Sequence, residues 1–216
     1  MGFDAKPFAL NRREYGARSL HEQDMADSPI TQFDHWFADA LAEKIADPTA
    51  MVLSTVDARG LPNSRVVLLK GIENNAFIFY TNYESTKSIE LDHTPYAALN
   101  FYWSTLARQV RIRGPIERVS RVASEAYFAT RSPMSQCSAI VSPQSRVIAS
   151  RDSLVHAAEA LKHDQADTAL TCPSYWGGFA VLAEAIEFWQ GRDHRLHDRI
   201  LYTKKKSKWI VSRLAS

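Results

Sequence analysis

The feature that most constrains the fold is a run of strand-type patterning from Ala50 to about Arg118. Apolar and polar residues alternate there with a period of two, whereas the preceding segment 29–46 has apolar residues at helical spacing. Turn-forming residues interrupt the run at Asp57-Ala58-Arg59-Gly60 and at Asn74-Asn75. Short strands joined by tight turns pair antiparallel. The sequence therefore predicts a mainly β (α+β) fold, an antiparallel barrel with helices packed outside it.

The same patterning sets the expected elements and domain limits. We expect strands over residues 51–56, 64–70, 76–81, 96–103, 109–118, 179–182, 185–190, 198–202 and 209–214. Helices are expected over residues 29–46, 84–93, 120–131 and 152–163, the first capped by Ser28 with Pro29 in its first turn. Residues 1–27 are polar and irregular, which predicts a mobile N-terminal arm. Residues 28–216 are expected to form a single domain.

Composition excludes several classes of function. The formal net charge of +2 argues against an extended nucleic-acid footprint, which needs a strong basic bias. No apolar run is long enough to span a bilayer, and the N-terminus lacks the features of a signal peptide. Cys137 and Cys172 are far apart, which favours reduced thiols in a cytoplasmic protein. The seven histidines show no metal-ligand spacing, so we expect no metal site.

Cationic side chains cluster near the C-terminus. If residues 195–199 form a strand, Arg195, His197 and Arg199 share one face, because side chains alternate along a strand. They follow Phe188-Trp189 closely, which favours a site for a flat, anionic ligand. A solvated basic edge that discourages strand pairing explains the same spacing equally well.

Two further segments have the residue types that bind phosphate. Residues 65–70 form an apolar strand with Arg65 and Lys70 at its ends, although a core strand with solvated ends gives the same pattern. Tyr80-Thr81-Asn82 precedes Ser85-Thr86-Lys87-Ser88 at a helix start, where backbone N–H groups, hydroxyls and a lysine favour an anion. Simple helix capping is the alternative for this second segment.

A third group follows in the next helix. Tyr127 and Arg131 are four residues apart, which predicts a shared helix face, and Ser135 lies just past the expected helix end. An arginine with two hydroxyls suits a second phosphate, although an exposed arginine beside a half-buried tyrosine is the other interpretation. The amides of Gln109 and Gln144, the latter next to Ser145, suit the polar edge of a heterocycle.

Taken together, these groups indicate two phosphate-bearing ligands. No nucleophile motif such as G-x-S-x-G, no P-loop and no G-x-G-x-x-G is present. Covalent catalysis by the protein is therefore not expected, and the redox or group chemistry would belong to a cofactor.

The motifs, taken in order, resemble one known family. They are Arg12-Arg13-Glu14-Tyr15, Asp47 to Met51, Arg65 to Lys70, Phe79 to Asn82, Arg108-Gln109-Val110, Trp176-Gly177-Gly178, Glu187 to Gly191 and His194 to Arg199. In this order the chain resembles the pyridoxamine (pyridoxine) 5′-phosphate oxidases over nearly its whole length. The resemblance implies a split β-barrel that binds FMN and forms a homodimer with FMN at the subunit interface.

The resemblance also implies a role for each matching residue. Arg65, Lys87 and Ser145 would hold the FMN phosphate, and the rest of the flavin would contact Val66, Val67, Leu68, Lys70, Tyr80, Thr81, Gln109, Gln144, Trp189 and Arg199. The substrate phosphate would contact Lys70, Tyr127, Arg131 and Ser135. The catalytic residues would be Arg195 and His197, against the pyridine ring, and the lid over it would be Arg12, Arg13, Glu14 and Tyr15. The family usually has Arg at the position of Thr86, a difference that should weaken FMN retention.

The implied reaction is oxidation of pyridoxamine 5′-phosphate and pyridoxine 5′-phosphate to pyridoxal 5′-phosphate. O2 would be the electron acceptor, H2O2 a product, and ammonia a further product from the amine. Two alternatives remain open at this point: a non-catalytic flavin-binding split-barrel protein and an NAD(P)H-dependent flavin reductase. A mere flavin carrier does not need the second phosphate site that Tyr127, Arg131 and Ser135 suggest, and a flavin reductase predicts that NADH rather than pyridoxine 5′-phosphate bleaches bound FMN.

Overall fold

The computed structural model describes residues 14–15, 18–165 and 168–216. Its internal contacts divide the chain into two compact units. The first unit contains the described residues up to Pro48 together with Phe101–Arg111 and Ala185–Ser216, and the second contains Thr49–Asn100 and Ile112–Glu184. The expected single domain over residues 28–216 stays a prediction, and most of the expected arm lies outside the described residues.

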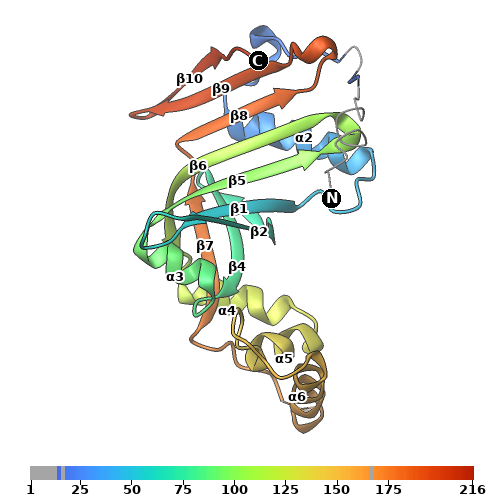
Figure 1. The fold of residues 1–216 in the computed structure, drawn as a ribbon, viewed down its shortest axis with the longest axis vertical. Helices are drawn as coiled ribbons and strands as arrows, with labels where there is room; N and C mark the ends of the chain where they lie inside the picture. Colours follow the sequence, from blue (N-terminus) through green and yellow to red (C-terminus); the bar gives the residue numbers. More distant parts are fainter. Residues whose placement is uncertain (1–13, 16–17, 166–167) are drawn as a thin grey trace, which may run out of the picture. The chain divides into compact units, whose positions relative to one another are not determined.

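The second unit is built on antiparallel strands (Figure 1). Strand β1 (Ala50–Val56) pairs with β2 (Pro62–Leu68) on one side and β5 (Tyr96–Trp103) on the other. Strand β4 (Ala76–Asn82) pairs with β3 (Gly71–Glu73) and β7 (Trp176–Leu182), and β7 also pairs with the end of β6 (Arg108–Arg118). Their inward side chains make an apolar core that includes Phe77, Phe79 and Phe179.

Tight turns join these strands where the sequence predicts them. In the β1–β2 turn, the Asp57 carboxylate accepts the backbone N–H groups of Arg59 and Leu61, and Gly60 has a φ of 81°. In the β3–β4 turn, Asn74 and Asn75 both have positive φ, as a type I′ turn requires. Both predicted hairpin turns are therefore confirmed.

Four helices belong to the second unit: α3 (Thr86–His93), α4 (Arg121–Thr130), α5 (Pro133–Val141) and α6 (Arg151–Asp164). Helices α5 and α6 pack side by side (Figure 1). The sequence analysis missed α5 because it took Pro133 as the end of the preceding helix. Ser132 caps α5 and Pro133 occupies its first turn, the same Ser-Pro signal that starts the helix at Ser28-Pro29.

In the described part of the first unit, an amphipathic helix packs on antiparallel strands. Helix α2 (Pro29–Ala42) buries Phe33 against Phe101 and Trp36 against Phe188, with ring centroids 5.1 Å apart in both pairs. The strands are β8 (Ala185–Gln190), β9 (Asp198–Lys205) and β10 (Lys208–Arg213), paired in that order. Its described residues also form short 3-10 turns: η1 (Glu22–Asp24), η2 (Ser104–Leu106) and η3 (Asp193–Arg195).

Two expectations about this unit are wrong. The helix expected to extend to residue 46 ends at Ala42, because Glu43 caps it and Lys44 has a φ of 54°. Residues 195–199 are not one strand: His194 and Arg195 have positive φ in the η3 turn, and the strand begins only at Asp198. Among the described helices, none is both long and apolar enough to cross a bilayer.

Candidate functional site

A cavity of about 970 Å³ opens in the second unit. Its wall combines an exposed apolar strand edge, a buried lysine, a half-buried arginine, several hydroxyls and a group of aromatic rings. The main contributors are Val66, Val67, Leu68, Lys70, Tyr80, Thr81, Lys87, Tyr127, Arg131, Ser132, Ser135, Gln144, Arg151 and Trp176. Eleven sequence-predicted site residues are in this list, so the fold brings together strand, helix and loop segments that are far apart in the chain.

Lys87 forms the first cationic group of the cavity. Its side chain is buried on α3, and its Nζ donates to Gln144 Oε1 (2.7 Å), Ser85 Oγ (3.0 Å) and Thr81 Oγ1 (3.1 Å). All three acceptors are uncharged. Burial, together with the nearby positive charge of Arg65, lowers the pKa of Lys87 to about 8. A buried ammonium group surrounded by neutral acceptors is a favourable partner for an anion.

Arg131 forms the second cationic group. Its guanidinium carbon lies 4.9 Å from the ring centroid of Trp176, and its Nη1 is buried without a hydrogen-bond partner in the described part of the chain. Burial lowers the pKa of Arg131. Because an unsatisfied buried N–H group is costly, this atom is suited to an acceptor on a bound ligand.

Stacked aromatic rings stand beside Arg131. Tyr80 stacks on Tyr127 with centroids 4.0 Å apart, and on Trp176 at 5.5 Å. Burial raises the pKa of both tyrosines, which keeps their hydroxyls protonated as donors. The rings give the cavity a flat, apolar wall next to a cation.

Tyr127, Arg131 and Ser135 do line one cavity, but the geometry differs from the predicted helix face. Helix α4 ends at Thr130, and Arg131 follows it with extended backbone. Ser135 lies in the first turn of α5, where Ser132 Oγ donates to its hydroxyl at 2.8 Å. The change of direction at Ser132-Pro133 therefore brings the three side chains together.

Arg65 and Ser145 lie outside the lining of this cavity. Ser145 is exposed and has a φ of 72°, directly after Gln144. Arg65 is mostly buried and donates to Glu90 Oε2 at 2.9 Å. Sequence reasoning did not single out Glu90, because its contact with Arg65 joins residues that are 25 positions apart in the chain.

In the first unit, aromatic and imidazole rings form a second cluster. The ring centroids of Trp189 and His197 are 4.8 Å apart. The ring of Tyr15 packs edge-on against both, with centroid distances of 5.7 Å. A Cβ at Gly191 would lie 2.8 Å from the Tyr15 ring, so glycine is needed for this approach. Glu14 Oε2 accepts the His194 N–H at 3.3 Å. Arg12 and Arg13 lie outside the described residues.

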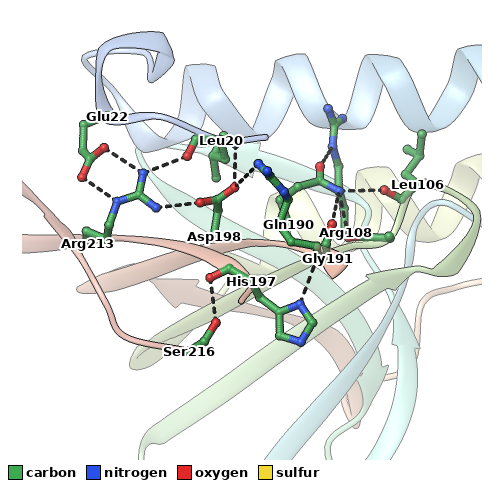
Figure 2. A network of polar contacts seen from close by, with 12 residues as sticks. Leu20, Glu22, Leu106, Arg108, Gln190, Gly191, His197, Asp198, Arg213 and Ser216 are labelled. Atoms are coloured by element: carbon green, nitrogen blue, oxygen red, sulfur yellow. Dashed lines mark hydrogen bonds and ion pairs between the residues drawn. The ribbon is translucent and has the colours of Figure 1, made fainter. Parts of the chain in front are cut away.

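The orientation of His197 is fixed by the backbone. Its Nδ1 accepts the N–H of Arg192 at 3.1 Å, which requires the ring proton to be on Nε2. Ser216 Oγ donates to the His197 carbonyl, and the neighbouring Asp198 accepts from Arg213 and from the N–H of Leu20 (Figure 2). These contacts hold the backbone carbonyl of His197 and the side chain of Asp198.

The other predicted residues of the first unit are dispersed. Arg195 is exposed, with a φ of 61°, so it does not share a strand face with His197 and Arg199. Arg199 Nε donates to the buried Glu187 carboxylate at 2.8 Å. Gln109 is half-buried on β6. Among the described residues, no group of three or more His, Cys, Asp or Glu is placed to hold a metal ion.

Comparison with known proteins identifies the class and then the family. The crystal structure of PhzG from Burkholderia lata in complex with tetrahydrophenazine-1-carboxylic acid matches with a TM-score of 0.85 and 27% identity, over 90% of this chain and 95% of that one. A pyridoxamine 5′-phosphate oxidase-related, FMN binding protein from Nostoc punctiforme matches the fold with a TM-score of 0.73 at 17% identity, over 89% of this chain and 100% of that one. The fold is thus an antiparallel split barrel with flanking helices, as predicted.

The family follows from sequence comparisons. A model described as pyridoxamine 5′-phosphate oxidase matches residues 37–163, and one described as pyridoxine 5′-phosphate oxidase C-terminal dimerisation region matches residues 176–216. Proteins named pyridoxine/pyridoxamine 5′-phosphate oxidase from Legionella pneumophila and Burkholderia ambifaria are 52% and 47% identical, each over 94% of this chain and 95% and 96% of their own lengths. The chain belongs to the pyridoxamine 5′-phosphate oxidase family.

Proposed function

We propose that this protein is an FMN-dependent oxidase that converts pyridoxamine 5′-phosphate and pyridoxine 5′-phosphate to pyridoxal 5′-phosphate. O2 is the electron acceptor, H2O2 is a product, and the amine also yields ammonia. The proposal is supported by relatives named pyridoxine/pyridoxamine 5′-phosphate oxidase, whose sequences are 52% and 47% identical to this one over 94% of the chain. The observation that carries it is one cavity containing two cations, the buried Lys87 and the half-buried Arg131, neither in an ion pair with a carboxylate of the described chain.

Two such cations suit two phosphates, one on a cofactor and one on a substrate. We assign the FMN phosphate to Lys87, with Arg65 and Ser145, and the substrate phosphate to Arg131, with Lys70, Tyr127 and Ser135. The neutral acceptors around Lys87 fit a phosphate, because the ammonium group can turn to it without breaking an ion pair. The unsatisfied Nη1 of Arg131 fits the second phosphate for the reason given above.

The remaining flavin contacts are assigned to residues of both units. Val66, Val67, Leu68, Tyr80, Thr81 and Gln144 line the cavity, and Gln109, Trp189 and Arg199 belong to the first unit. We propose that these residues meet in a homodimer with FMN at the subunit interface, for which the matched dimerisation region over residues 176–216 is support. A cytoplasmic location is part of the proposal and is compatible with two free, buried cysteines.

The protein residues would act mainly by binding and orientation. Bound FMN would supply the acceptor for the hydride equivalent that leaves the substrate carbon. His197 would offer its Nε2–H to the substrate, and Arg195 would balance negative charge near the pyridine ring. Glu14 and Tyr15, which already contact His194 and Trp189, would cover the ring together with Arg12 and Arg13 and exclude water.

The direct test is aerobic turnover by the purified protein supplied with FMN. We expect pyridoxal 5′-phosphate to appear from pyridoxamine 5′-phosphate with one H2O2 per aldehyde, measured by absorbance and by a coupled peroxidase assay. Bleaching of the flavin by NADH without aldehyde formation would indicate a flavin reductase instead. Tight flavin binding with neither reaction would indicate a non-catalytic carrier.

A further inference from the structure

A buried carboxylate lies beside the cavity and is not accounted for by the assignments above. Glu90 on α3 is only 5% exposed, and both of its oxygens are engaged. Oε2 accepts from Thr55 Oγ1 at 2.5 Å and from Arg65 Nη2 at 2.9 Å, and Oε1 accepts from Asn63 Nδ2 at 2.9 Å. All three donors belong to the β1–β2 hairpin, so Glu90 ties that hairpin to the helix that contains Lys87.

Thr55 closes this contact into a ring. Its hydroxyl donates to Glu90 and accepts from Arg65 Nη1, also at 2.5 Å. Arg65 Nη1 has a further acceptor in the carbonyl of Leu53, at 3.4 Å. The guanidinium is therefore fixed at both terminal nitrogens. A long side chain that is fixed before a ligand arrives loses less conformational entropy on binding.

The same carboxylate acts on Lys87. Lys87 and Glu90 are three residues apart on α3 and lie on the same side of the helix. The positive charge of Arg65 lowers the pKa of Lys87, whereas the negative charge of Glu90 raises it. Glu90 thus offsets the repulsion between two cations that must be close together to share one phosphate.

We infer that Glu90 is a positioning residue for the cofactor phosphate: it holds Arg65 in place and allows Arg65 and Lys87 to stand together as a cationic pair. Glu90 does not contact the ligand itself. The inference rests on the proposed function, because it takes FMN as the phosphate-bearing cofactor. It adds a residue whose effect is confined to the phosphate and does not extend to the isoalloxazine ring.

Because the effect of Glu90 should be limited to the phosphate, the test compares FMN with riboflavin, the same flavin without phosphate. Dissociation constants of both are measured by flavin fluorescence quenching for the wild type and Glu90→Gln. We expect the variant to lose about tenfold in FMN affinity, the size of one charge-assisted hydrogen bond, with riboflavin affinity unchanged. Asp92→Asn is the matched control, since it removes the same charge from the same helix but breaks an exposed pair with Arg118.

Three results would overturn the inference. Equal losses for FMN and riboflavin would indicate a purely structural role, and unchanged FMN affinity would indicate none. Tighter FMN binding by Glu90→Gln would show that Glu90 competes with the phosphate for Arg65. If Glu90→Gln does not fold, Thr55→Val provides the test. It keeps every charge but removes the hydroxyl that links Glu90 to Arg65, and we expect about a threefold loss of affinity for FMN alone. A wild type that binds FMN no better than riboflavin would instead contradict the phosphate assignment in the proposed function.

Discussion

Lys87 and Arg131 line the same cavity, yet the surroundings of the two cations differ. Lys87 donates to three neutral acceptors, and Glu90, three residues away, partly offsets the lowering of its pKa by burial and Arg65, so its hydrogen bonds are made before any ligand binds. Arg131 lies over aromatic rings with one nitrogen unsatisfied. The difference suits a cofactor that remains bound through many turnovers at Lys87 and a substrate that exchanges at Arg131. The Nη1 of Arg131 would have no hydrogen-bond acceptor from the described chain until a ligand binds.

The comparison predicts its largest effect at Arg131. In Arg131→Leu we expect kcat/KM for pyridoxamine 5′-phosphate to fall about 100-fold, mostly through KM, because a buried charge-assisted contact to the substrate phosphate is lost. FMN affinity should change less than about twofold, since the other cation is untouched. Steady-state kinetics and a flavin titration on the same preparation measure both quantities.

Unphosphorylated pyridoxamine provides the control for that variant. Wild type and Arg131→Leu should handle it equally poorly, because neither can gain from a phosphate that is absent. If the variant lost the same factor with pyridoxamine, Arg131 would act on the ring or on the fold rather than on the phosphate. The assignment of Arg131 would then be wrong.

The converse change is Lys87→Met, which keeps the apolar stem and removes the charge. We expect FMN affinity to fall about 30-fold and riboflavin affinity to be unaffected, since only the phosphate contact is removed. With FMN at saturation, KM for pyridoxamine 5′-phosphate should be close to the wild-type value. A KM that rises as much as the flavin dissociation constant would mean that the two cations do not serve separate ligands.

How far the sequence predicts this arrangement depends on whether the signal is local. The strands, the two hairpin turns and the helices capped by Ser28 and Ser120 follow from residues that are adjacent in the chain, whereas the Ser132-capped helix α5 was missed. Arg195 was misplaced because the strand period was assumed to continue through a turn in which two non-glycine residues have positive φ. Such a conformation depends on surrounding contacts and has no clear sequence signal.

The site shows the same division. The sequence alone suggests that residues 80–87 and 127–135 bind phosphate. Nothing in the sequence, however, links Lys87 to Gln144 or Arg65 to Glu90. Those pairs are separated by 57 and 25 residues and depend on how the hairpin, helix and loop pack. The stacking of Tyr80, Tyr127 and Trp176 likewise joins three separate segments. Resemblance to a family supplied these groupings, whereas the residues alone left them open.

A smaller effect should appear as a pH dependence that only Lys87 produces. The pKa of Lys87 is lowered from 10.5 to about 8, so the free protein loses this proton as the pH rises above 8. Phosphate binding must then restore the proton, and FMN affinity should fall with a slope that approaches about tenfold per pH unit. Below pH 7 the lysine is already charged and the slope should vanish.

Two comparisons isolate this slope. Riboflavin binding should show none of it between pH 7 and pH 9, since riboflavin has no phosphate. Lys87→Arg should also remove it, because a guanidinium stays charged throughout this range. A slope that persists in Lys87→Arg would assign the titration to another group and remove the contrast between the two cations.

The smallest effect concerns stability without ligands, where the two cations should also differ. Arg131→Met keeps an apolar side chain against Trp176 and removes the unsatisfied nitrogen. We expect the free energy of unfolding of the ligand-free protein to rise by about 1 kcal/mol, measured by urea denaturation, because removing a charged group that has a buried, unsatisfied nitrogen is often stabilising. In saturating pyridoxal 5′-phosphate the order should reverse, since only the wild type gains the full binding energy. A variant that is less stable in both conditions would show that the contact of Arg131 with the aromatic rings outweighs its missing hydrogen bond. The missing hydrogen bond of Arg131 would then not explain why the site favours its ligand.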